Sequence, residues 1–245
     1  MANPKNVKNN VKNTVIGIHA VEALLVHSPD KIQELFLNQS RHDEKFEKII
    51  NLAKENNISI QKLDPIPEHS QGVVAHCSAK KHDTDLKTVL ENLTKPALFL
   101  ILDGVQDPHN LGACIRSANA AGVDAVIIPK DRAAPLNETA KKAASGAAEF
   151  TEIITVTNLS QTIELLKKNN IWIYGLDGSA EKTIYAEDFK HSTAFVLGGE
   201  GEGLRRLTRE HCDGLVSIPM VGEIESLNVS VAAGICLFEV VRQRK

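Results

Sequence analysis

The chain has 245 residues, a formal net charge of −3 and 42% hydrophobic residues, a composition typical of a globular protein with a substantial core. No apolar run approaches the roughly 20 residues of a membrane span, and the polar N-terminus lacks the apolar segment of a signal peptide. We therefore expect a cytoplasmic protein with no membrane association. The slightly acidic balance excludes a uniformly basic domain, so any RNA-binding surface must be a local patch.

The cysteines are too dispersed for a zinc site or a disulfide framework. None forms a Cys-x-x-Cys pair, and the short spacing of His109 and Cys114 is not matched by a second pair. A structural zinc ion needs four protein ligands, so we expect no metal. The four cysteines are Cys77, Cys114, Cys212 and Cys236.

The first third of the chain is predicted to form a small α/β domain. Residues 1–13 combine lysines and asparagines with little to bury, which predicts a disordered basic tail. Residues 14–77 contain two helical and three strand patterns. Residues 78–95 are polar and charged and predict a linker between domains. The expected elements are helices at 18–25 and 43–56, and strands at 32–37, 58–63 and 72–76.

From residue 96 to residue 245, apolar strands alternate regularly with helices. This alternation predicts a parallel sheet covered by helices on both faces. Ligands of such sheets bind beyond the carboxyl ends of the strands, where the polar, glycine-bearing loops of this half fall. The expected strands are 98–102, 123–128, 152–156, 171–176, 194–197 and 215–218, and the helices are 111–121, 137–144, 159–169, 204–211 and 229–242.

Two of these loops carry polar residues beside a helix start. Asn110 stands where a helix begins, and Arg116 follows within a helix otherwise built from small residues. Ser226 and Asn228 precede the last helix and suit a helix N-cap, but they share a short loop with further acids. Polar groups crowded between buried elements need partners, and a ligand is one candidate.

The third loop, LGGEGEGL at residues 197–204, follows an apolar strand directly. Its glycines let the backbone approach a ligand closely, but it matches neither the dinucleotide fingerprint nor the phosphate-binding loop. Glu200 inside it would repel a pyrophosphate. An adenosyl ligand with a cationic sulfonium suits this loop better.

Three segments together resemble the motifs of the SpoU family of RNA ribose 2′-O-methyltransferases. They are LDGVQDPHNLGACIRSANAAG, VLGGEGEGL and IPMVGEIESLNVSVAAGI, in that order and at the expected strand ends. GIHAVEALL and QGVVA, nearer the N-terminus, resemble the ribosomal-protein-L30e-like substrate-binding domain of the bacterial subfamily that methylates a guanosine of 23S rRNA.

The resemblance implies a fold that periodicity alone does not predict. It implies a C-terminal SPOUT domain over residues 96–245, with a parallel sheet and a C-terminal trefoil knot, after an L30e-like domain over residues 14–77. It also implies a homodimer with the active site near the interface. S-adenosylmethionine would be the methyl donor, and 23S rRNA or a precursor ribosomal particle would be the substrate, with the target in the peptidyl-transferase P-loop.

The resemblance also assigns site residues. Asn110 and Arg116 match the first motif, Glu200 the acid of the second, and Ser226 and Asn228 the polar pair of the third. Because arginine is essentially never deprotonated, we expect Arg116 to orient the ribose hydroxyl and stabilise developing alkoxide charge. The residues expected to bind the methyl donor are Leu197, Gly198, Gly199, Ile218 and Leu227.

Three other functions remain open. The same chemistry on tRNA is the nearest alternative, and the separate N-terminal domain argues against it only by analogy. A non-catalytic RNA-binding assembly factor is disfavoured by the presence of all five matched catalytic side chains, and a Rossmann-type oxidoreductase by the missing glycine fingerprint. The last open point is a set of bases that are equally well interpreted as a phosphate-facing patch or as solvated helix faces: Lys141, Lys142, Arg205, Arg206 and Arg209.

Overall fold

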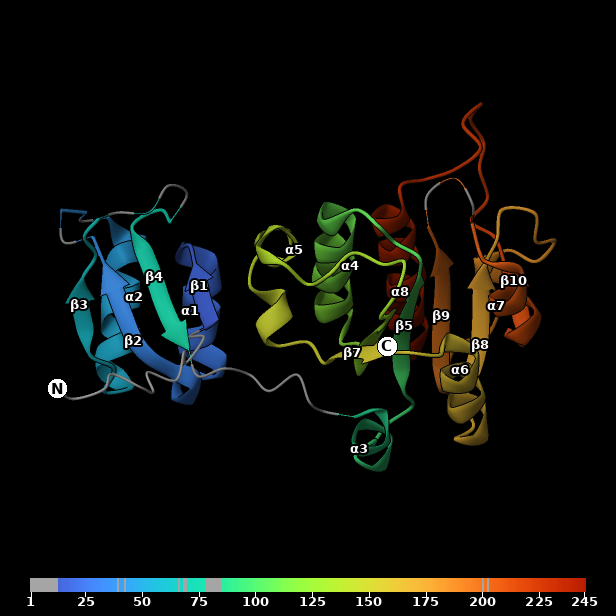
Figure 1. Cartoon of the computed structure of the whole chain (residues 1–245), viewed down its shortest axis with the longest axis horizontal. Helices are drawn as coiled ribbons and strands as arrows, with labels where there is room; N and C mark the ends of the chain where they lie inside the picture. The colour runs from blue at the N-terminus through green and yellow to red at the C-terminus, as the bar shows by residue number, and fades with distance from the viewer. Residues whose placement is uncertain are drawn as a thin grey trace, which may run out of the picture. The chain divides into compact units, whose positions relative to one another are not determined.

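The computed structural model describes residues 13–38, 40–41, 43–65, 67, 70–77, 85–199, 201 and 203–245. The chain divides into two compact units, residues 1–81 and 82–245 (Figure 1). Most of the tail predicted at 1–13, and the first part of the linker predicted at 78–95, lie outside the described residues. The predicted domain boundaries stay a prediction.

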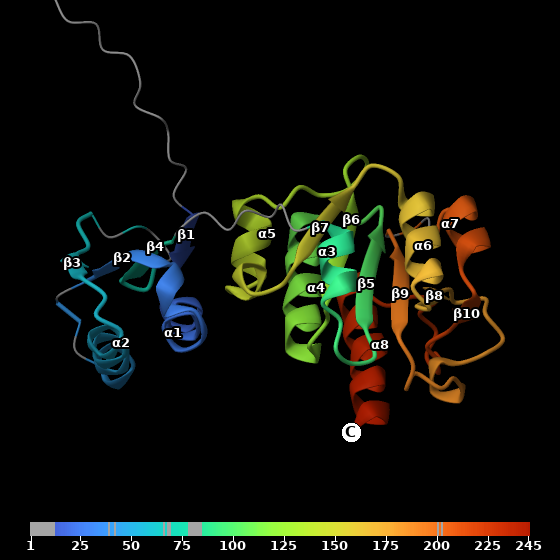
Figure 2. The same ribbon diagram turned by 90° about the horizontal axis from the view of Figure 1, so that it is seen from below.

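The N-terminal unit is a four-stranded sheet in the order β1-β4-β2-β3, with two helices on one face (Figure 2). Among the described strands of this unit, β2 and β3 are the one parallel pair. Four strands stand where three were expected, because the short β1 pairs antiparallel with β4 through residues too few to show a periodicity. The elements are β1 (Asn13–Ile16), α1 (Ile18–His27), the 3-10 turn η1 (Pro29–Lys31), β2 (Ile32–Leu37), α2 (Glu44–Glu55), β3 (Ile60–Lys62) and β4 (Val73–Cys77).

Local sequence explains why α2 forms. The Asp43 carboxylate caps its first turn by accepting a hydrogen bond from the backbone N–H of Phe46. Phe46, Ile49 and Ala53 recur at helical spacing and are buried against the sheet.

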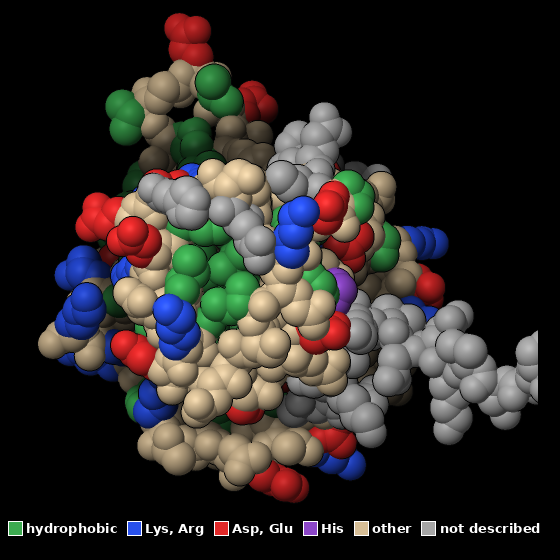
Figure 3. All heavy atoms as spheres, turned by 90° about the vertical axis from the view of Figure 1, so that its left-hand side faces the viewer, with side chains coloured by type: hydrophobic (Ala, Val, Ile, Leu, Met, Phe, Trp, Pro, Cys, Tyr) green, Lys and Arg blue, Asp and Glu red, His purple; other side chains and the backbone are tan. Residues whose placement is uncertain are grey.

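On the face of the molecule in Figure 3, Lys and Arg side chains are interspersed with Asp and Glu around an apolar centre. This face therefore shows no uniformly basic surface.

The C-terminal unit is a six-stranded sheet in the order β10-β8-β9-β5-β6-β7, and every pairing is parallel. The parallel α/β sheet predicted from the alternation is confirmed. The trefoil knot expected from the resemblance stays a prediction. The strands are β5 (Leu98–Asp103), β6 (Ala125–Pro129), β7 (Ile153–Val156), β8 (Trp172–Leu176), β9 (Thr193–Gly198) and β10 (Gly214–Val216).

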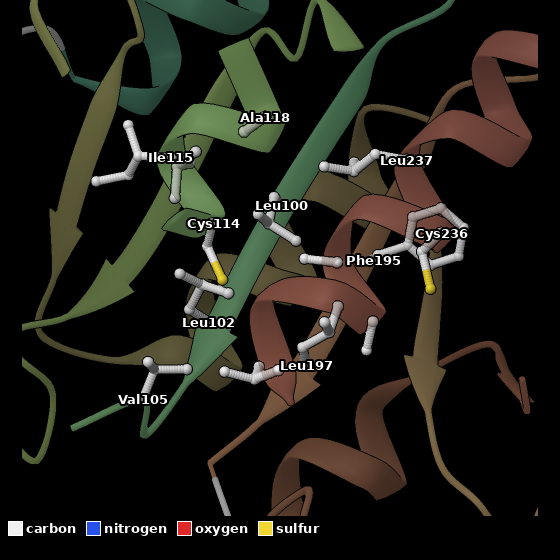
Figure 4. Packing of buried hydrophobic residues seen from close by; sticks show 14 of the residues in the cluster. Leu100, Leu102, Val105, Cys114, Ile115, Ala118, Phe195, Leu197, Cys236 and Leu237 are labelled. Carbon is white, nitrogen blue, oxygen red and sulfur yellow. The ribbon is translucent and has the colours of Figure 1, made fainter. Parts of the chain in front are cut away.

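Helices cover both faces of this sheet (Figure 2). Leu98, Leu100 and Leu102 of β5 face a core shared with α4, α5 and α8, part of which is drawn in Figure 4. Phe99 and Ile101 face the opposite core, with α3 and α6. The helices and 3-10 turns are α3 (Leu86–Glu91), α4 (Pro108–Ala121), α5 (Glu138–Ala143), η2 (Ala147–Glu149), α6 (Leu159–Lys168), η3 (Ile184–Ala186), α7 (Arg206–His211) and α8 (Val229–Arg244).

The last helix, α8, is anchored at its C-terminal end by Arg244. Its guanidinium donates hydrogen bonds to the carbonyls of Pro96 and Ala97, just before β5, at 2.7 and 2.9 Å. It also donates to the carbonyls of Phe189 and His191, just before β9, at 2.9 and 2.5 Å. One side chain thus ties the chain end to the starts of two central strands.

No helix of the described residues is long and apolar enough to cross a membrane. The described residues also hold no group of three or more His, Cys, Asp or Glu side chains arranged to bind a metal ion.

Candidate active site

A cavity of about 490 Å³ opens beyond the carboxyl ends of β5 and β9, the central pair of strands. Parallel sheets bind ligands at this edge. The chain leaves β5 toward β6 on one side and leaves β9 toward β10 on the other, so the two connections run in opposite directions along the sheet. Its walls come from the loop after β5, the start of α4 and the glycine loop after β9. The lining residues are Asp103, Gly104, Val105, Gln106, Asp107, Asn110, Gly199, Gly203 and Arg205.

A hydrogen bond joins the first and third motifs across 118 residues of sequence. The Asn228 amide nitrogen donates to the side-chain oxygen of Asn110 at 2.9 Å. Asn110 is buried in the first turn of α4, which begins with the Asp107 cap and Pro108. Asn228 also caps α8, because its side-chain oxygen accepts the backbone N–H of Ser230 at 2.9 Å. The two asparagines predicted for the site therefore lie together.

The first two glycines of the glycine loop, Gly198 and Gly199, pack so closely that a side chain has no room at either position. A Cβ on Gly198 would lie 2.0 Å from the carbonyl carbon of Gly203, and one on Gly199 would lie 2.5 Å from the Gly104 carbonyl oxygen. Real Cβ atoms are not found at such distances. These glycines were predicted to approach a ligand, but their first role is in packing. Gly198 lets the loop after β9 fold back on itself, and Gly199 lets it pack against the loop after β5.

The other residues predicted for the site differ in how much of their side chains is exposed. Leu197 is 1% exposed and packs in the core, so only its backbone faces the loop. Ile218 is half-buried against the same core. Leu227 is 36% exposed, and Ser226 is also exposed, in the segment between β10 and α8 that extends from the sheet in Figure 1. Glu200 lies outside the described residues.

Arg116 does not line the cavity. It follows Asn110 by six residues, roughly 9 Å along the helix axis. Its side chain is exposed, and its Nη1 donates to the Ser145 hydroxyl at 3.3 Å, at the end of α5. One copy of the chain therefore does not bring Arg116 together with the two asparagines.

The sequence places Asp103 in a polar loop at the ligand-binding edge, but sequence reasoning assigned it no role in the site. Its carboxylate is buried beneath the cavity, 3.2 Å from Nη1 of Arg205, and neither of its oxygens accepts a hydrogen bond from a described residue. Arg205 had been noted only as one of several bases. The available signal was an acid ending the otherwise apolar strand LFLILD, at the edge where ligands bind.

Three cysteine thiols are unsuited to nucleophilic chemistry. Burial raises the pKa of Cys114 and of Cys212 to about 12, and it also raises the pKa of Cys236. Because the thiolate is the reactive form, these side chains stay protonated and inert near neutral pH. The polar groups at the cavity are therefore the candidates for chemistry.

Family models match both units of the chain. The model of the SpoU rRNA Methylase family matches residues 97–238, and that of the RNA 2′-O ribose methyltransferase substrate-binding domain matches residues 14–82. The 23S rRNA (guanosine-2′-O-)-methyltransferase RlmB of Escherichia coli strain K12 is 51% identical over 94% of this chain and 98% of its own. The enzyme of the same name from Pseudomonas aeruginosa is 49% identical over 94% of this chain and 96% of its own.

Solved structures show the same architecture. The SpoU methyltransferase AviRb from Streptomyces viridochromogenes, in complex with the cofactor AdoMet, covers 98% of this chain and 94% of its own, with a TM-score of 0.76 and 23% identity. The A. aeolicus TrmH/SpoU tRNA modifying enzyme is 32% identical but covers 64% of this chain and 79% of its own, with a TM-score of 0.56.

Proposed function

The chain belongs to the SpoU rRNA methylase family, and on that premise we propose that it methylates the ribose 2′-hydroxyl of a guanosine in 23S rRNA. The observation that carries the proposal is 51% identity to a 23S rRNA guanosine methyltransferase along 94% of the chain, through both units. We place the target in the peptidyl-transferase P-loop, on 23S rRNA or a precursor particle in the cytoplasm, from the resemblance of the sequence motifs to that subfamily.

The residues at the sheet edge fit S-adenosylmethionine as methyl donor. Leu227 and Ile218 each leave apolar side-chain surface uncovered, which suits the adenine ring. We assign the backbone around Gly198 and Gly199 to the adenosyl moiety from the match to the second motif, and Gly199 lines the cavity. When bound, the donor supplies a methyl group on a cationic sulfonium, open to in-line attack by an oxygen.

The chain's own side chains would then position the ribose. The hydrogen bond between Asn110 and Asn228 holds their two side-chain amides together, with Asn110 in the cavity wall. From the motif match we assign Ser226 and Glu200 to positioning in the same reaction. Holding two reactants in line can lower the activation free energy of the reaction by roughly 7–11 kcal/mol. Positioning is thus the main contribution that we assign to these residues.

We assign Arg116 to the same reaction in a homodimer. Val231, Ile235 and Phe238 form a stripe at helical spacing on α8; the first and last are 50% and 48% exposed. Ser117, next to Arg116, lies beside Gly234 of α8. A second copy of the chain that covers this stripe would bury its apolar surface. In that dimer, Arg116 of one copy would approach the cavity of the other copy. There the guanidinium would stabilise alkoxide charge.

Methyl transfer to defined RNAs tests the proposal. Purified protein and S-adenosylmethionine are incubated with unmodified 23S rRNA, precursor particles or tRNA, and 2′-O-methyl groups are mapped. Methylation of a single 23S rRNA guanosine is expected, and methylation of tRNA alone would contradict it. Arg116→Ala should bind S-adenosylmethionine normally in a calorimetric titration yet transfer no methyl group. Mixing Arg116→Ala with Asn110→Ala should restore partial activity if the arginine acts across the dimer.

A further inference from the structure

The buried ion pair between Asp103 and Arg205 has no role in the mechanism above. Asp103 is 1% exposed, and Arg205 lies in the cavity wall at the start of α7 with a side chain 36% exposed. The pairing leaves both carboxylate oxygens without a hydrogen bond from a described residue. A buried carboxylate in this state costs stability, so its presence needs a reason other than folding.

Gly104 makes room for the arginine. A Cβ at this position would lie 3.1 Å from Nη2 and 3.7 Å from Cζ of Arg205, so the guanidinium lies against bare backbone. Gly104 also has a φ of +87°, which side-chain-bearing residues rarely adopt. Asp103 on one side and Gly104 on another therefore hold the guanidinium in one place at the cavity.

We propose that Arg205, held by Asp103, recognises the guanine base of the target nucleotide in this cavity. The inference rests on the proposed function, because it names the base that the same site accepts. A cavity of about 490 Å³ is large enough for a nucleoside. Asn110, assigned to the ribose, lines the same cavity, so base and ribose would share it.

Charge favours a neutral base over a phosphate. The positive charge of Arg205 is already balanced by Asp103, and the Asp107 carboxylate also lines the cavity. Among the described lining residues, a phosphate would meet two carboxylates for one guanidinium. Guanine instead presents two adjacent acceptors, O6 and N7, which match the forked donors of arginine. In this arrangement Arg205 touches the substrate, whereas Asp103 is a positioning residue that acts through it.

The test removes one acceptor from the base. A short hairpin of the target region is prepared with guanosine or 7-deazaguanosine at the methylated position, and both kcat/KM and equilibrium affinity without methyl donor are measured. The wild-type protein should prefer guanosine about 10- to 100-fold, the usual discrimination of a bidentate base contact. Arg205→Lys keeps the charge beside Asp103 but loses the fork, and it should treat both RNAs nearly alike.

Two further variants separate recognition from folding. Asp103→Asn/Arg205→Gln removes both charges together and leaves no uncompensated buried carboxylate, so it should fold and also lose the preference. Arg206→Ala is the matched control, because that exposed side chain pairs with Glu210 at 3.0 Å and does not line the cavity. It should keep the preference.

Three results would overturn the inference. The first is a wild-type protein that does not distinguish the two RNAs. The second is an undiminished preference for guanosine in Arg205→Lys. The third is an Arg205 variant that loses affinity for both RNAs equally and binds them with a weaker salt dependence, which indicates a phosphate contact. If the wild-type protein transfers no methyl group to any RNA, the proposed function fails, and the affinity measurements still decide the inference.

Discussion

Asn228 has two structural roles that single substitutions can separate. Its side-chain oxygen caps α8, and its amide nitrogen donates to Asn110. Alanine removes both interactions, whereas serine is as good an N-cap as asparagine but too short to reach Asn110. The cap is worth about 1 kcal/mol, and the hydrogen bond contributes about 1 kcal/mol. We therefore expect Asn228→Ala to lose about 2 kcal/mol and Asn228→Ser about half of that.

Calorimetry and methyl-transfer kinetics test this separation. For a unit of this size, each kcal/mol shifts the melting temperature by roughly 2–4 °C, so the two variants should differ measurably. Both should lose activity alike, by roughly 100-fold, because small displacements of positioning groups have effects of that order. Ser230→Ala is the control: it removes the hydroxyl that donates to the Asn228 side-chain oxygen at 2.6 Å but keeps the backbone cap and the bond to Asn110, so it should keep activity.

Two outcomes would refute this reasoning. Wild-type kcat/KM in Asn228→Ser would show that the link to Asn110 is not needed for catalysis. Equal losses of melting temperature in the serine and alanine variants would show that the cap does not stabilise α8.

The other predictions concern close packing and pH. Gly198→Ala should weaken binding of S-adenosylmethionine in a calorimetric titration, because its Cβ would displace the glycine loop; unchanged affinity would contradict this. Gly112→Ala places a Cβ 2.3 Å from a carbonyl oxygen of α5, so overpacking of about 1–3 kcal/mol should outweigh the gain in helix propensity and lower the melting temperature. Hydrogen bonds from Arg242, and then from Gln243, lower the pKa of Glu239. The stabilisation from Glu239 should therefore be present at neutral pH and be lost as the pH falls below its ordinary value of 4.5; Glu239→Gln should melt with less dependence on acid pH.

The sheet of the C-terminal unit could be predicted because its signal is local. Six apolar runs alternate with helical patterns, and each run overlaps one strand of the sheet, even β7 and β10, which are only four and three residues long. The strand β1 could not be found this way, since its residues NTVI belong to no such alternation and become a strand through pairing with β4. Strand order is also a long-range property, which periodicity does not contain.

The candidate site was also predictable only where its signal is local. The polar loops were visible from the sequence, but the contact of Asn110 with Asn228 joins residues 118 positions apart. Asp103 gave only a weak signal, because nothing local shows that a carboxylate at a strand end will be buried beside Arg205. Arg116 shows the opposite limit: a family motif names it, yet one copy of the chain does not place it at the cavity.

The anchoring of α8 at both ends has a practical consequence for work on this protein. Asn228 fixes its first turn to the cavity, and Arg244, one residue from the end of the chain, fixes its last turn to the starts of β5 and β9. A peptide fused after Lys245 would begin next to that anchor and could pull the helix along its axis. Loss of methyl transfer in such a fusion would therefore be expected from a displaced α8 even where every side chain of the cavity is intact.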